Sequence, residues 1–260
     1  MSRPAPVPIF YEAGPEIRCM IYREILVPPN ALHVRRTHQR LCSMPCRNLN
    51  PQADRQSDIH SSCWPPLADD GTVLRRLPGE PPRQNQILPL LCSCRGVYTE
   101  AIRLLYEANR FHFDSPLTVQ ALPLCMVPRR LASIRYIRLD IQAFENRAIV
   151  ADVSSSWEEA CTVLAGIEAL EELVVILRSL DKGTMYKPLP LLPLLRPLTK
   201  ITALRYVVEV PPLDDPEEIV GGLGVVPFTL ETRDFLHGVI HQCSWWGREE
   251  SERPRWLPPL

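Results

Sequence analysis

The chain has 260 residues, of which 45% are hydrophobic, so it is long enough to bury a sizeable core without disulfides or metal ions. Its 29 basic and 30 acidic side chains nearly cancel, which excludes a global field that attracts nucleic acid or an anionic membrane. The 28 prolines against 11 glycines predict stiff connections and few long helices.

The cysteines and the apolar runs bear on the compartment. The most apolar run, Leu189 to Leu198, is broken by prolines and is shorter than the roughly 20 residues that a membrane helix needs. The first ten residues lack the basic and apolar regions of a secretory signal. Nine irregularly spaced cysteines predict reduced thiols. We therefore expect no membrane span and a cytoplasmic or nuclear location.

Residues 1–13 alternate proline with small residues and predict a flexible N-terminus, and residues 14–29 hold the first predicted helix. Pro15 suits the first helical position, and Glu16 complements the positive end of the helix dipole. An isoleucine recurs at every fourth position, at Ile17, Ile21 and Ile25, and together with Met20 these side chains predict one apolar stripe.

Residues 30–86 are rich in proline, arginine, glutamine, serine and aspartate, and they show no sustained period of 2 or 3.6 residues. We expect a disordered insertion here, because such a composition buries too little apolar surface to order the chain.

Residues 87–128 are predicted to hold a second helix, a short strand and a further helix. The second helix runs from Leu88 to Ala108, Asn109 caps its end, and Ser115 caps the helix that follows the strand. We expect the first two helices to pack against each other through one shared apolar core: Ile17, Ile21, Tyr98, Ile102 and Leu105.

Residues 129–243 carry an apolar pattern with offsets 0, 3, 6, 8 and 10 that starts at Leu131, recurs at Ile167 and recurs again at Leu198. Helix-like stretches separate the copies, including one that a capped start at Ser154-Ser155-Ser156 introduces. Parallel strands with helices on one face, as in a leucine-rich solenoid, would bury all three copies. An α/β sheet with coincidental spacing is the alternative. A closing helix is predicted over 229–242, before a tail at 244–260.

No constellation meets the spacing rules for catalysis, a cofactor or a metal. His237 and His241 lie one helical turn apart, with Cys243 nearby, but lack the glutamate of a metalloprotease motif. Gly221-Gly222-Leu223-Gly224 lacks the lysine of a phosphate loop and predicts a turn. The insertion contains six possible zinc ligands: His33, His38, Cys42, Cys46, His60 and Cys63. Structural zinc sites need two close ligand pairs, and the spacing of these residues does not supply them. We expect no catalytic residue, no cofactor and no metal.

Two motifs carry a resemblance to a known family. They are PEIRCMIY at Pro15–Tyr22 and LLCSCRGVYTEAIRLLYEANRF at Leu90–Phe111. At these motifs the chain resembles a large fungal group of F-box-like proteins that carry a domain of unknown function. The resemblance extends more loosely to about Val210. It implies an α+β fold in which F-box-like N-terminal helices precede a short leucine-rich-repeat-like α/β unit.

In the broader F-box class, the N-terminal helices dock on a Skp1-type adaptor and the C-terminal repeats select a protein for ubiquitination. The resemblance therefore implies a non-catalytic interaction protein with one set of protein-binding residues: Pro15, Ile17, Ile21, Tyr22 and Ile25. Two other classes stay open, namely an α/β enzyme with an unrecognised site and a nucleic-acid binder that uses the arginine-rich insertion. The near-zero net charge disfavours the last class.

Overall fold

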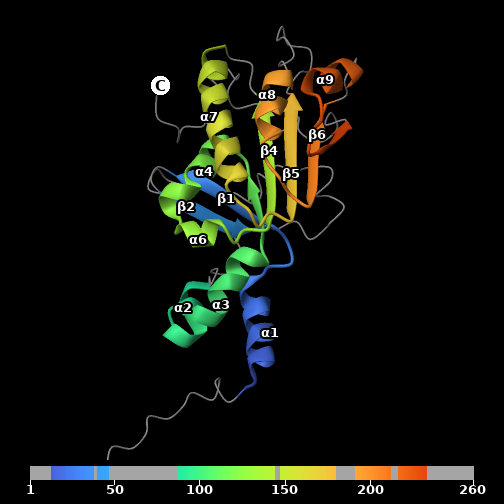
Figure 1. The fold of residues 1–260 in the computed structure, drawn as a ribbon. Helices are drawn as coiled ribbons and strands as arrows, with labels where there is room; N and C mark the ends of the chain where they lie inside the picture. The colour runs from blue at the N-terminus through green and yellow to red at the C-terminus, as the bar shows by residue number, and fades with distance from the viewer. Residues whose placement is uncertain are drawn as a thin grey trace, which may run out of the picture.

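A seven-stranded sheet forms the body of the protein, and a group of helices protrudes from one end of it (Figure 1). This computed structural model describes residues 13–37, 40–46, 87–143, 147–179, 191–211 and 216–232. In chain order the strands are β1 (Leu32–Thr37), β2 (Arg40–Pro45), β3 (Arg110–Phe113), β4 (Tyr136–Ala143), β5 (Glu172–Ser179), β6 (Arg205–Val210) and β7 (Thr229–Thr232).

The helices fall into a protruding group and a layer on the sheet. The protruding group contains α1 (Pro15–Leu26), α2 (Ile87–Leu91) and α3 (Arg95–Glu107). Short helices follow β3, and longer ones lie between the later strands: α4 (Pro116–Gln120), α5 (Leu122–Cys125), α6 (Pro128–Leu131), α7 (Arg147–Ala165), α8 (Leu191–Leu198) and α9 (Pro216–Leu223).

The sheet has the order β2-β1-β3-β4-β5-β6-β7, and β2 is the one antiparallel strand in it. Parallel neighbours need crossover connections, and α7 and α8 supply them between β4, β5 and β6. Side chains from both helices, such as Trp157 and Leu195, pack with the strands in one core. The protein is therefore a mixed α+β fold with a mostly parallel sheet.

The predicted apolar repeat matches the sheet register in two copies and slips in the third. Ile137 pairs with Leu173, as the pattern requires, and both side chains are buried. Leu173 then pairs with Tyr206, and not with Leu204, which is 89% exposed. The third strand thus begins two residues later than the pattern predicts, because the turn after the buried Ile201 is longer than its counterpart in the second copy.

The predicted insertion begins with a hairpin. Residues 32–37 and 40–45, expected to be disordered, form β1 and β2, and β1 joins the sheet by parallel pairing with β3. Leu32 and Val34 are buried beside Phe111 and Phe113. Two apolar positions are therefore enough to order β1 once it pairs with β3. The rest of the predicted insertion, residues 47–86, lies outside the described residues.

Several helix boundaries also differ from the prediction. The long helix predicted from Leu88 is two helices, because Cys94 adopts an extended conformation and accepts a hydrogen bond from the Val97 backbone N–H. Ser115 caps α4 as predicted, yet the helix breaks at Ala121 and continues as α5.

Three further segments were assigned wrongly or in part. Ser154-Ser155-Ser156 lies inside α7 and does not begin it, and residues 229–232 form β7 where a helix was predicted. Gly221 and Gly222 belong to α9, and the turn is confined to Gly224, whose φ of 72° favours glycine. The remainder of the predicted closing helix and the tail lie outside the described residues.

The register shift generates a stability test. We expect Leu173→Ala to lower the free energy of unfolding by about 2–5 kcal/mol, because a fully buried side chain leaves a cavity. Leu204→Ala should change it by less than about 0.5 kcal/mol, because this side chain is 89% exposed. Chemical denaturation measures both, and equal losses would contradict the observed register.

Candidate functional site

The two motif helices pack against each other, although the predicted insertion and the hairpin separate them in the chain. Tyr22 and Leu26 of α1 are fully buried, and they share a cluster with Val97, Ala101 and Ile102 of α3. The pairing of the first helix with the motif helix is therefore confirmed.

The face of α1 that makes this contact is not the predicted one. Ile17 is 51% exposed and Ile21 is 36% exposed, whereas Tyr22 and Leu26 point into the core. On α3, Ile102 is buried as predicted, but Tyr98 is 41% exposed. Apolarity alone favours burial of the isoleucine stripe. The side of α1 that faces the core is instead set by polar partners of this helix.

Those partners converge on Glu100 of α3. Arg18 Nε donates to Glu100 Oε2 at 2.9 Å, and Arg18 Nη2 donates to Oε1 at 2.8 Å. The Tyr22 hydroxyl donates to Oε2 at 3.0 Å, which lets this residue be buried with its polar atom satisfied. Hydrogen bonding to Arg18 lowers the pKa of Glu100, and the same bond raises the pKa of Arg18.

A buried asparagine ties the far ends of the two helices together. The Asn109 side chain is 1% exposed, and its Nδ2 donates to the carbonyl oxygens of Leu26 and Leu105, at 2.9 Å in both cases. The predicted cap of the motif helix is confirmed, and Asn109 caps α1 as well. One side chain thus satisfies terminal carbonyls of both helices.

The five predicted protein-binding residues divide between the surface and the core. Pro15, Ile17 and Ile21 are exposed on α1, whereas Tyr22 is buried and Ile25 packs partly against the helical core. Met20, a member of the same predicted apolar stripe, is 67% exposed. It lies three residues after Ile17 and therefore on the same helix face. We call Ile17, Met20 and Ile21 the outer face of α1.

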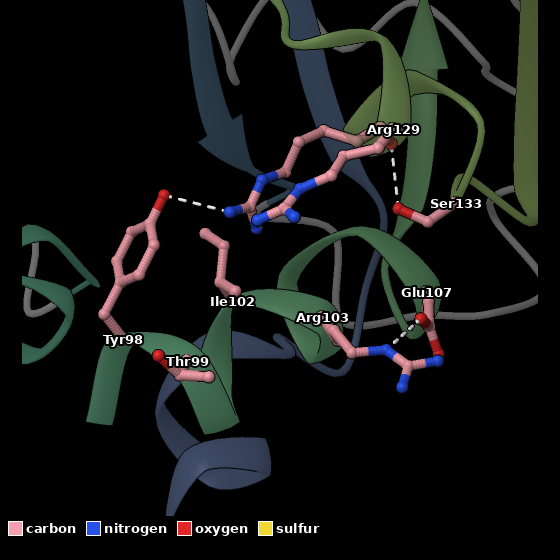
Figure 2. A pocket seen from close by; sticks show the side chains of 8 residues that line it. Tyr98, Thr99, Ile102, Arg103, Glu107, Arg129 and Ser133 are labelled. Atoms are coloured by element: carbon pink, nitrogen blue, oxygen red, sulfur yellow. Dashed lines mark hydrogen bonds and ion pairs between the residues drawn. The ribbon is translucent and has the colours of Figure 1, made fainter. Parts of the chain in front are cut away.

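A pocket of about 420 Å³ lies on another side of α3, where α6 approaches it (Figure 2). The Arg130 guanidinium donates to the Tyr98 hydroxyl at 3.0 Å and lies 5.3 Å from the centre of its ring. The pocket is lined by one aliphatic, one aromatic and six polar or charged residues: Ile102, Tyr98, Thr99, Arg103, Glu107, Arg129, Arg130 and Ser133.

Three of the residues weighed as metal ligands lie in the described ranges. His33 lies in β1 and Cys42 in β2, while Cys46 is buried just after β2, and the other candidates fall outside the described residues. Within the described ranges no group of three metal-ligating side chains converges. His33 instead neighbours His112 of β3, with ring centres 4.9 Å apart. Sequence analysis missed this buried pair, because the two histidines meet only through strand pairing.

The shared cap generates a test of the helical pair. Asn109→Ala should lower the free energy of unfolding by about 1–3 kcal/mol, because one buried and one partly buried carbonyl group lose their donor. Thr99→Ala is the matched control, because its hydroxyl also bonds a helical carbonyl but is exposed. Thermal denaturation of both variants measures the difference. An unchanged melting temperature for Asn109→Ala would contradict the capping role.

The Glu100 network generates a pH test. Because the pKa of Glu100 is lowered on folding from its ordinary value of 4.5, its stabilisation is present above that pH and is lost as the pH falls through the folded value. Glu100→Gln should therefore melt below the wild type at pH 7, and the gap should close in acid. Glu24→Gln, on an exposed position of α1, should show no such convergence. A gap that is independent of pH would count against the network.

Among the described residues, no helix is long and apolar enough to cross a membrane.

Comparison with known proteins identifies the family of the chain. Neither a curated protein nor a solved structure matches the sequence. Residues 7–222 match the domain of unknown function DUF7730, so the match includes both motif helices and the sheet as far as β6. The chain therefore belongs to the DUF7730 family.

Proposed function

We propose that this chain is a non-catalytic, intracellular protein-interaction module whose N-terminal helices dock on a Skp1-type adaptor of a ubiquitin ligase. The resemblance of Pro15–Tyr22 and Leu90–Phe111 to F-box-like proteins supports the proposal. The structural observation that carries it is the outer face of α1, which holds apolar side chains away from both cores of the protein.

The outer face has the spacing of a helical docking surface. Ile17, Met20 and Ile21 follow one another at intervals of three and one residues, so they form a single patch on the helix. They are 51%, 67% and 36% exposed. Burying one such side chain in an interface contributes roughly 1.5–3 kcal/mol, so the patch could supply much of a micromolar affinity.

The inner side of α1 makes this patch rigid. Arg18 and Tyr22 hold the helix on Glu100, and Asn109 holds its last turn. The rotation of α1 is thereby defined before any partner binds. A patch that is already ordered loses less conformational entropy on association than a flexible one does.

In this proposal the sheet is the part that selects a protein for the ligase. Five strands, β3 to β7, are neighbours in the order in which they occur in the chain. Leucine-rich solenoids also place consecutive parallel strands side by side with helices on one face. The sheet order therefore supports the leucine-rich-repeat-like interpretation of this region.

The docking proposal is tested with recombinant adaptor. The double variant Ile17→Asp/Met20→Asp should weaken binding at least tenfold, because it places two charges in the apolar interface. It should leave the fold intact, because both side chains are more than half exposed. Biolayer interferometry measures the affinity and circular dichroism the fold.

The matched control is Leu124→Asp/Val127→Asp, which adds the same charges at apolar positions that are 84% and 58% exposed elsewhere on the surface. This control should bind like the wild type. Absence of binding by the folded wild-type protein at micromolar concentrations, or equal losses in the two double variants, would remove the adaptor from the proposal.

A further inference from the structure

The pocket between α3 and α6 carries excess positive charge. Its one carboxylate, Glu107, accepts hydrogen bonds from Arg103 at 2.8 Å and from Arg135 at 3.2 Å, so its charge is already compensated. Arg129 and Arg130 make no ion pair with a carboxylate in the described part of the chain. These two guanidinium groups therefore leave the pocket with two uncompensated positive charges.

The two arginines are held in different ways. Arg130 is fixed by the Tyr98 hydroxyl and lies near the rings of both Tyr98 and Tyr106, at 5.3 and 5.8 Å. Arg129 is exposed, and Figure 2 shows its side chain reaching from α6 into the pocket towards Tyr98 and Ile102. Two like charges on adjacent residues repel each other. An anion bound between them would attract both and so offset that repulsion.

The walls and the size of the pocket indicate an organic ligand. Ile102, which is buried, and the ring of Tyr98 give the pocket an apolar side. Its volume of about 420 Å³ falls within the usual range for small-ligand sites, roughly 300–1,000 Å³. The arginine side and the apolar side lie within one pocket, so a single ligand could contact both.

We propose that this pocket binds a phosphate monoester through Arg129 and Arg130, with the organic part of the ester against Tyr98 and Ile102. Guanidinium groups match phosphate oxygens as bidentate donors. A phosphate monoester carries about −1.5 to −2 charges near neutral pH, which matches two arginines better than a single carboxylate does. A phosphorylated side chain of a partner protein and a small free phosphate ester share this chemistry.

This binding is separate from adaptor docking. The pocket lies between α3 and α6, whereas the outer face belongs to α1, and no residue is common to the two surfaces. Loss of phosphate binding would therefore leave the docking proposal intact, and loss of adaptor binding would leave the pocket proposal intact.

Isothermal titration of the full chain with phenyl phosphate, inorganic phosphate and benzoate tests the ligand class. Phenyl phosphate should bind saturably and at least tenfold more tightly than benzoate, which has the same ring but one negative charge. It should also bind more tightly than inorganic phosphate, because only the ester contacts the apolar side. Equal affinities for phenyl phosphate and benzoate, or no saturable binding of phenyl phosphate, would overturn the proposal.

Arg129→Ala is the decisive variant, because this side chain is exposed and its loss should not affect folding. It should weaken phenyl phosphate binding at least tenfold, and Arg129→Lys should retain part of the affinity. Arg196→Ala is the matched control at an exposed position of α8, and it should bind like the wild type. Equal effects of Arg129→Ala and Arg196→Ala would show that the pocket is not the site.

The source of the ester is distinguished with peptides. Degenerate peptide pools with a central phosphotyrosine or phosphoserine are compared with the same pools lacking the phosphate. Tighter binding of a phosphorylated pool than of phenyl phosphate, lost in Arg129→Ala, supports a phosphorylated protein as the ligand. Binding of phenyl phosphate that exceeds that of every pool supports a small free ester.

Discussion

The rotation of α1 about its own axis depends on one carboxylate. Glu100 of α3 accepts hydrogen bonds from both Arg18 and Tyr22, which lie four residues apart on α1 and therefore on one side of the helix. With that side turned inward, Leu26 follows it into the core. Ile17 and Ile21 are then left outside. The same interaction thus defines the interior of the helical pair and the apolar surface that α1 leaves exposed.

A second set of polar contacts connects the helical pair to the sheet. Arg135, just before β4, bonds Glu107 of α3 at 3.2 Å and Glu171 at 2.7 Å, and Tyr136 donates to Glu171 at 2.6 Å. The bond from Tyr136 lowers the pKa of Glu171, with Arg135 acting in the same direction. Tyr106 packs against both hydrophobic cores. The helices are therefore braced against the sheet by charge pairs at the surface and by an aromatic ring inside.

One helix, α3, contributes to both candidate interaction surfaces, because it positions α1 and also lines the pocket. The side of α3 that bears Glu100 and Ala101 holds α1, whereas the side that bears Thr99 and Arg103 forms the pocket with α6. Helix positions three or four apart share a side, and so the motif around Glu100 encodes both surfaces at once. The dense sequence motif in α3 thus reflects two sets of neighbours.

Local patterns in the sequence determined the elements whose signals are short in range. The start of α1 at Pro15, the caps at Ser115 and Asn109 and the strands around Ile137 and Leu173 were all predicted, because capping and periodicity act within a few residues. Tertiary structure alone decided the rest. The strand pair β1 and β2 is ordered because β1 pairs with β3 and its two apolar side chains join the same core. The pocket exists because the chain returns to α3 after β3, and the rotation of α1 depends on a carboxylate 82 residues away from Arg18. Such partners leave no local period in the sequence, since pairing across a fold depends on where distant segments meet.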